Sequence, residues 1–114
     1  MCIKMLSKQD IMEINKEFDK GNIVNKSSLE YTLSILKNTK DWLKQVSYLV
    51  RAILIDHIFE EGNKRTAAAI IIAYFDANKF AYDTYKLDKI IEKIVKKNIN
   101  NINEIRRLIK SVIR

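Results

Sequence analysis

The stretch that decides the fold runs from Leu49 to Asn78 and reads LVRAILIDHIFEEGNKRTAAAIIIAYFDAN. Apolar residues dominate both of its ends, whereas the centre, Asp56 to Arg65, is mostly polar and holds the only histidine and one of the two glycines. Long apolar runs without proline predict helices that are buried on most sides. The stretch therefore predicts two central helices joined by a short polar loop.

Helical spacing continues upstream of this stretch. Ser7 is the predicted N-cap of a first helix that stops at Gly21. Ser27, followed three residues later by Glu30, has the form of a capping box and predicts a second helix that continues to Lys37. Two helices should therefore precede the central pair.

The helix that enters the loop has two candidate N-caps, Thr39 and Asp41. The helix that leaves the loop is expected over residues 66–78, and two amphipathic helices close the chain. Their expected inward positions are Leu87, Ile90, Ile91, Ile94 and Val95 in one helix and Ile102, Ile105, Ile109, Val112 and Ile113 in the other.

Length and composition agree with an all-α protein. The chain has 114 residues, of which 47% are hydrophobic and 31% charged, and it contains no proline and two glycines. Hairpin turns and β-bulges depend on those two residue types, whereas helices joined by short polar connections do not. We predict one domain over residues 1–114, a bundle of about six helices with two buried central helices on either side of the loop.

The N-terminal residues and the single cysteine indicate the cellular compartment in which the protein is expected. Cys2 cannot form an intramolecular disulfide, and the apolar run at the N-terminus is too short for a signal peptide. The longest apolar runs are shorter than the roughly 20 residues that span a bilayer. These features predict a cytoplasmic protein without a membrane partner.

The net charge of +7 comes from the C-terminal part of the chain. Nine of the 21 basic residues follow Tyr85, against three of the 14 acidic ones. One interpretation is a solvated face on the terminal helices. The other is a docking surface for an acidic protein segment or for RNA.

The residue types of the central loop suit phosphate chemistry. A helix N-terminus binds phosphate through its free N–H groups, and Gly62 allows close approach of the backbone. Lys64 and Arg65 add positive charge, Glu61 is an oxygen ligand of the type that holds Mg²⁺, and His57 can take a proton from a hydroxyl group. The order of residues outlines a site for phosphoryl or nucleotidyl transfer.

Each of these residues also has a structural explanation. His57 can pack or cap, Glu60 and Glu61 can complement a helix dipole, and Gly62 can end the preceding helix. A P-loop is excluded because the first glycine and the preceding strand are missing, and a zinc hydrolase is excluded because a second histidine or a suitable cysteine is missing.

The string HIFEEGNKRTA at residues 57–67 closely resembles the signature of the Fic/Doc family. Members of that family carry His-x-Phe-x-(Asp/Glu)-(Gly/Ala)-Asn-(Gly/Lys)-Arg on a loop between two central helices. A weaker likeness extends from Leu6 to Phe80, and residues 21–33 fall where the family has the flap that positions its target.

The resemblance implies a role for each matching residue. His57 matches the general base that activates a target hydroxyl, Phe59 the aromatic that anchors the loop, and Glu61 the Mg²⁺ ligand. Arg65 matches the arginine that stabilises phosphate charge during transfer. The positions that match the cradle for the phosphates of ATP are Gly62, Asn63, Lys64 and Arg65.

Three positions depart from the pattern of the adenylylating members. Those enzymes have a proline where this chain has Ile58, a second glycine at Lys64 and a second arginine at Ala68. The Asn-Lys-Arg-Thr-Ala form instead resembles the Doc toxin branch. That likeness implies a kinase that moves the γ-phosphate of ATP to a threonine of a translation elongation factor, with a Fic-type adenylyltransferase as the alternative.

The likeness also implies how such an activity is controlled. No Ser or Thr is followed by Glu four residues later, so the glutamate motif that inhibits some Fic proteins in cis is missing. A separate antitoxin is the expected partner, and an acidic segment of it would suit the basic C-terminal part.

A non-catalytic helical module that binds RNA or a protein is the alternative from another class. The chain after Tyr85 has no aromatic residue for stacking on bases, so nucleic acid is not the expected partner.

Overall fold

The computed structural model describes residues 6–114, and Cys2 lies outside that range. Within residues 6–114 no strand forms, and the only β-type pairings are the isolated bridges Ile23–Phe59 and Tyr82–Ile113. The all-α prediction is therefore confirmed. The six helices are α1 (Lys8–Lys16), α2 (Lys26–Leu36), α3 (Trp42–Leu54), α4 (Asn63–Ala77), α5 (Thr84–Lys96) and α6 (Ile102–Lys110).

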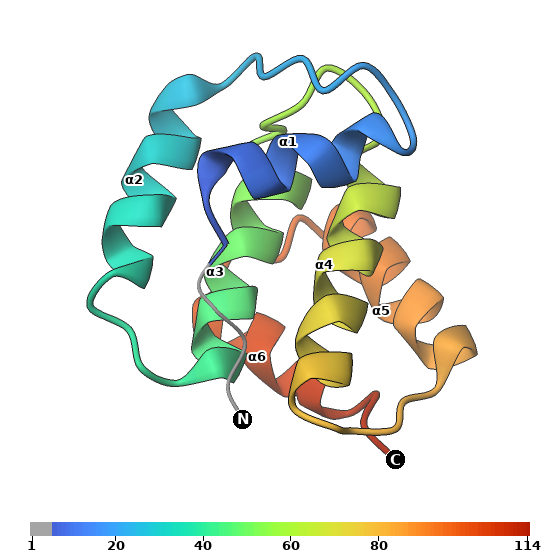
Figure 1. The fold of residues 1–114 in the computed structure, drawn as a ribbon. Coiled ribbons are helices and arrows are strands. Elements are labelled where there is room, and N and C mark those ends of the chain that lie inside the picture. The colour runs from blue at the N-terminus through green and yellow to red at the C-terminus, as the bar shows by residue number, and fades with distance from the viewer. Residues whose placement is uncertain (1–5) are drawn as a thin grey trace.

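Helices α3 and α4 form the centre of the bundle, as expected. α3 packs against α2, α4 and α6, while α4 also packs against α1 and α5 (Figure 1). Burial surrounds most of α3, but on α4 it follows one side, and Ala68, Ala69, Ile72 and Ala73 are only half-buried. The expectation that α4 is buried on most sides is wrong. Helices α1 and α5 cover only part of its surface, so one side of α4 stays partly accessible to solvent.

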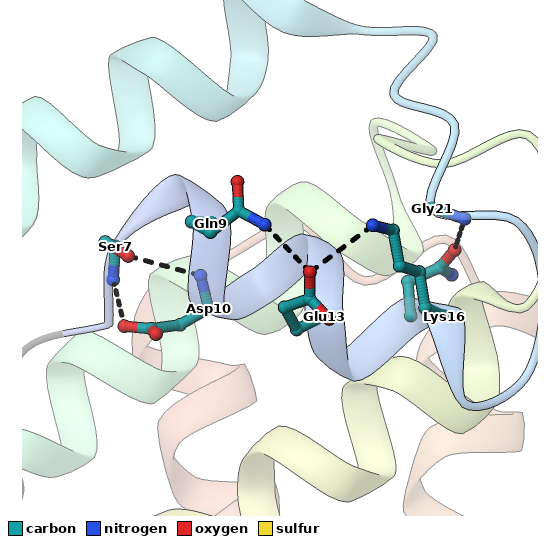
Figure 2. Close-up of polar contacts among 7 residues, drawn as sticks. Ser7, Gln9, Asp10, Glu13, Lys16 and Gly21 are labelled. Carbon is teal, nitrogen blue, oxygen red and sulfur yellow. Dashed lines mark hydrogen bonds and ion pairs between the residues drawn. The ribbon is translucent and has the colours of Figure 1, made fainter.

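Helix α1 is shorter than the sequence predicted. Ser7 caps it as expected and forms a reciprocal capping box with Asp10 (Figure 2). The helix ends at Lys16 rather than before Gly21, because the carbonyl of Asn15 accepts the N–H groups of Phe18 and Asp19 and closes a turn. The four residues after Lys16 therefore fold back toward the start of α4 and do not extend α1.

Asn25, and not Ser27, is the N-cap of α2. Its Oδ1 accepts the N–H of Ser28 at 3.2 Å, and its Nδ2 donates to the carbonyl of Asp56 at 2.9 Å. The second bond ties the cap to the loop after α3, a tertiary contact that a local capping pattern does not contain. Asp41 caps α3, which settles the choice between the two predicted candidates.

Helix α4 begins three residues before the predicted start at residue 66. Its first turn consists of Asn63, Lys64 and Arg65, which are polar and at least partly exposed. The apolar pattern begins only at the second turn, so hydrophobic periodicity placed the start too late.

The C-terminal helices complete the core. Leu87, Ile90, Ile91 and Ile94 of α5 are buried as predicted, whereas Val95 is half-buried. In the last segment Ile105, Ile109 and Val112 are buried, while Ile102 and Ile113 are half-buried. Val112 lies in a turn beyond the end of α6. Among the described helices, none combines the length and the apolar character needed to cross a bilayer.

Candidate active site

One pocket of about 540 Å³, here called the motif pocket, opens where the α3–α4 loop meets α4. All six predicted site residues line it, together with residues from three other parts of the chain. Figure 1 shows the α1–α2 connection and the α3–α4 loop at the same end of the bundle. The lining residues are Phe18, Asp19, Leu54, His57, Glu61, Gly62, Asn63, Lys64, Arg65 and Val95.

His57 stands at the turn between the end of α3 and the buried part of the loop. Its backbone is left-handed, with φ of 50°, and its side chain is exposed at the motif pocket. Histidine is one of the residue types that adopts this conformation more readily than most. The next two residues, Ile58 and Phe59, are fully or almost fully buried. An exposed imidazole is thus held on a loop that is anchored immediately beside it.

The buried part of the loop is tied to the connection between α1 and α2. The carbonyl of Ile58 accepts the N–H of Val24 at 2.7 Å, and the N–H of Glu60 donates to the carbonyl of Asn22 at 3.1 Å. Phe59 lies between these bonds, bridges to Ile23 and is 1% exposed. The burial expected of Phe59 is therefore observed, and the loop has a fixed backbone path.

The side chain of Asn63 bonds to the loop and does not face an anion. Its Oδ1 accepts the N–H of Phe59 at 3.1 Å, and its Nδ2 donates to the carbonyl of Phe59 at 2.9 Å. Asn63 was expected to take part in a phosphate cradle, but only its backbone N–H remains for that purpose. The side chain instead fixes the loop against the first turn of α4.

Asn15 of α1 is a residue of the site that the sequence did not single out. It is fully buried, and its Nδ2 donates both to the carbonyl of Glu61 at 3.0 Å and to Thr66 Oγ1 at 2.9 Å. Its Oδ1 accepts the N–H of Gly21 at 2.8 Å, the bond drawn at Gly21 in Figure 2. One signal was present in the sequence, since an asparagine four residues after Ile11 occupies the apolar face of the helix.

The N-terminus of α4 has no side-chain cap. Gly62 is the N-cap residue in a left-handed conformation, with φ of 77°, and no side chain accepts the N–H groups of the first turn. An added Cβ at this position would lie 3.1 Å from Nδ2 of Asn15. Glycine is therefore favoured at this position by conformation and by space. The helix presents uncapped N–H groups with partial positive charge.

The two cations of the first turn have different surroundings. Nζ of Lys64 lies 3.0 Å from Oε1 of Glu92 on α5, and this ion pair lowers the pKa of the Glu92 carboxyl group, chiefly through the hydrogen bond. Arg65 forms no ion pair with any residue in the described range. Its guanidinium group is free to contact an anion.

The pocket offers two carboxylates as oxygen ligands. Glu61, which was predicted, and Asp19, which was not, both line it. Residues 6–114 contain no group of three or more His, Cys, Asp or Glu side chains that could hold a metal ion. Mg²⁺ commonly binds through one or two carboxylates plus waters and substrate phosphates. Glu61 and Asp19 are therefore carboxylates of the type and number that such an ion uses.

Comparison of the chain with protein-family models, with curated proteins and with solved structures gave no match. Any functional argument therefore depends on the residues of the motif and on the pocket that they line. The geometry places an uncapped helix start beside an exposed imidazole and two carboxylates.

Proposed function

We propose that this protein is a Doc-like phosphotransferase of the Fic/Doc type. In this proposal it transfers the γ-phosphate of ATP to a Ser or Thr hydroxyl group of a target protein of the elongation-factor class. The observation that carries the proposal is that His57, Glu61 and the uncapped start of α4 share one pocket. A base, a metal ligand and an anion cradle are the parts that such a transfer requires.

His57 is the proposed general base. Its exposed imidazole takes the proton of the target hydroxyl as that oxygen forms a bond to the γ-phosphorus. The bond between the γ-phosphorus and the bridging oxygen of ADP breaks, and ADP leaves with that electron pair. The left-handed backbone at His57 and the buried residues that follow it hold the ring at the edge of the pocket.

The start of α4 is the proposed cradle for the phosphates. Backbone N–H groups of the first turn, with Gly62 allowing close approach, bind phosphate oxygens. Arg65, which has no internal ion-pair partner in the described range, stabilises the negative charge that develops during transfer. Glu61, with Asp19 nearby in the lining, would hold Mg²⁺, which neutralises phosphate charge when it is bound.

Ala68 favours transfer of the γ-phosphate over adenylylation. It lines a smaller pocket of about 330 Å³, here called the second pocket, together with Lys64, Arg65, Asp88, Ile91 and Glu92. The pocket has two acidic residues and no cation besides those of the first turn of α4. It therefore lacks the additional arginine that adenylylating members of the family use to orient the distant phosphate.

A separate antitoxin is the proposed partner, and the cytoplasm, where ATP and elongation factors occur, is the proposed site of action. Lys93, Lys96 and Lys97 are exposed near the end of α5 and form no ion pair within residues 6–114. An acidic segment of an antitoxin would be complementary to them. Replacing all three with Glu should weaken antitoxin binding, and unchanged affinity at low salt would contradict this contact.

The proposed activity is tested with purified protein, Mg²⁺, cell extract and ATP labelled at the α or the γ position. Label from γ alone supports phosphorylation, label from α supports adenylylation, and no transfer in either case contradicts both. His57→Asn is the informative variant, because Asn tolerates the left-handed backbone but does not act as a base at neutral pH. It should abolish transfer while the helical circular dichroism is unchanged.

Arg65→Lys should reduce transfer by about 10²-fold or more, because lysine does not reproduce the planar donor geometry of arginine. Arg107→Lys is the matched control. Arg107 is exposed on α6, forms no ion pair in the described range and does not line the motif pocket. Equal losses in both variants would remove Arg65 from the proposed mechanism.

A further inference from the structure

The contact between Lys64 and Glu92 links the proposed phosphate cradle to α5. Nζ of Lys64 and Oε1 of Glu92 are 3.0 Å apart, and both side chains are about half exposed, at 52% and 61%. Of the ion pairs formed within residues 6–114, this is the only one that includes a residue of the motif pocket. One of the two cations at the start of α4 is thus already paired with an internal anion.

Lys64 stands on the border between two pockets. It lines the motif pocket, and it also lines the second pocket, where Glu92 lies. The lysine side chain is a point charge on a long flexible stem, so its ammonium group can turn from one pocket toward the other. A phosphate in the motif pocket and the carboxylate of Glu92 therefore compete for the same ammonium group.

The ion pair is weak enough to be displaced. Exposed ion pairs contribute little to stability, because water and salt screen them and ordering two long side chains costs entropy. A polyphosphate anion carries more charge than one carboxylate and is held at the same time by backbone N–H groups of α4. Glu92 should therefore reduce the contribution of Lys64 without preventing anion binding.

We propose that Glu92 is an affinity-setting residue of the phosphate site, an internal competitor that must release Lys64 before Lys64 can bind a nucleotide phosphate. The inference rests on the proposed function, since it takes the motif pocket as the place of the phosphates. Glu92 acts through Lys64 and does not touch the transferred group. It keeps nucleotide affinity moderate and makes release of the product nucleotide easier.

A double-mutant cycle tests the inference with inorganic pyrophosphate as the probe. Isothermal titration would compare the full chain with Glu92→Gln, Lys64→Gln and the double variant. Glu92→Gln should tighten pyrophosphate binding about two- to fivefold, which is the loss of one exposed ion pair expressed as a ratio of dissociation constants. Glu92→Gln in the Lys64→Gln background should have no effect, because the ammonium group for which Glu92 and the phosphate compete is absent.

Asp88→Asn is the matched control for charge. Asp88 lies one helical turn before Glu92 on α5, lines the second pocket and forms no ion pair with a described residue. The control removes the same charge without touching Lys64, so it should change pyrophosphate affinity less than Glu92→Gln does. Equal tightening by both variants would show a general field effect and overturn the inference.

The other outcomes are also decisive. Unchanged or weaker binding in Glu92→Gln would overturn the inference, as would the same tightening in the presence and absence of Lys64. No pyrophosphate binding in any of the four proteins would overturn it together with the phosphate cradle. The labelled-ATP assay is independent of this cycle, so a failure of phosphoryl transfer with an intact cycle would overturn only the proposed reaction.

Discussion

The side chain of Asn63 bonds to both backbone polar groups of Phe59, accepting its N–H at 3.1 Å and donating to its carbonyl at 2.9 Å. The two residues lie on opposite sides of the turn that leads into α4. A single amide thereby fixes the path of the chain between the buried Phe59 and the uncapped helix start. The loop keeps its shape through this contact and through the bonds from residues 22–25.

Asn63→Ala should lower the free energy of unfolding by about 1–3 kcal/mol, because two hydrogen bonds are lost and the polar groups of Phe59 are left without their partner. Chemical denaturation followed by circular dichroism measures the change. Asn103→Ala is the control, since Asn103 is exposed on α6 and makes no side-chain bond in the described range. A stability loss confined to Asn103→Ala, or equal in both, would contradict the role of Asn63.

Asn15→Ala should be more damaging, with a loss of about 2–4 kcal/mol. The substitution leaves the N–H of Gly21 and the carbonyl of Glu61 without their buried partner, and each unsatisfied group costs about 1–3 kcal/mol. Asn22→Ala removes only an exposed bond to Glu60 at 3.2 Å and should change stability by at most about 0.5 kcal/mol. Hydrogen exchange of the loop amides should accelerate in the first variant only.

Lys79→Gly should stabilise the protein. Lys79 follows the C-cap of α4 with φ of 62°, and the N–H groups of Lys79 and Phe80 bond to the carbonyls of Asp76 and Phe75. This is the Schellman arrangement, in which glycine is preferred. Relief of the left-handed backbone should raise the free energy of unfolding by up to about 1 kcal/mol.

The control for Lys79→Gly is Lys89→Gly, at an exposed position in the middle of α5. Glycine in a helix interior is destabilising by about 1 kcal/mol relative to the best helix formers. The two substitutions change the same residue type in the same way but should move the denaturation midpoint in opposite directions. A loss of stability in Lys79→Gly would contradict the assigned conformation.

Tyr74 should make stability fall at high pH. Burial raises the pKa of its hydroxyl group from 10.0 to about 12, because the charged phenolate is poorly solvated in the core. The folded protein therefore holds this proton more tightly than the unfolded chain does. The contribution of this group to the free energy of unfolding is fully present below about pH 10 and is lost as the pH rises through about 12.

The measurement for Tyr74 is the difference in unfolding free energy between the protein and Tyr74→Phe as a function of pH. Other groups also titrate in that range, so the difference isolates the one hydroxyl. Tyr74→Phe should show a shallower decline above about pH 10. Parallel curves for the two proteins would contradict the effect of burial on this group.

The sequence was most informative where a pattern is local and repeated. Six helices, the N-cap at Ser7 and the central position of α3 and α4 follow from apolar spacing and cap residues, and the structure confirms them. The C-terminal end of α1, the start of α4 and the cap of α2 were misplaced. The cap of α2 depends on a contact with a distant segment, between Asn25 and Asp56, and α4 begins with a polar first turn. Helix α1 ends in a turn closed by the carbonyl of Asn15.

Some residues of the candidate site could be predicted from the sequence and others could not. The residues of the loop could be selected from the sequence because they are adjacent in the chain and form a recognisable string. Asp19 and Val95 could not, since they enter the pocket from other elements. The engagement of the Asn63 side chain with Phe59 also went unpredicted, because the residue type alone does not say which partner an amide will bond.

The order of residues alone therefore determined the helical class of this protein and the set of residue types in its central loop, because both depend on neighbouring positions in the chain. Only the tertiary structure decided which groups stay free. Packing of α1 against α4 commits Asn15 to the loop backbone, and packing of α5 brings Glu92 to Lys64, while Arg65 and the first N–H groups of α4 remain without a partner in the described part of the chain. Hydrogen bonds and ion pairs require approach within a few ångströms, which distant residues reach only after the chain has folded.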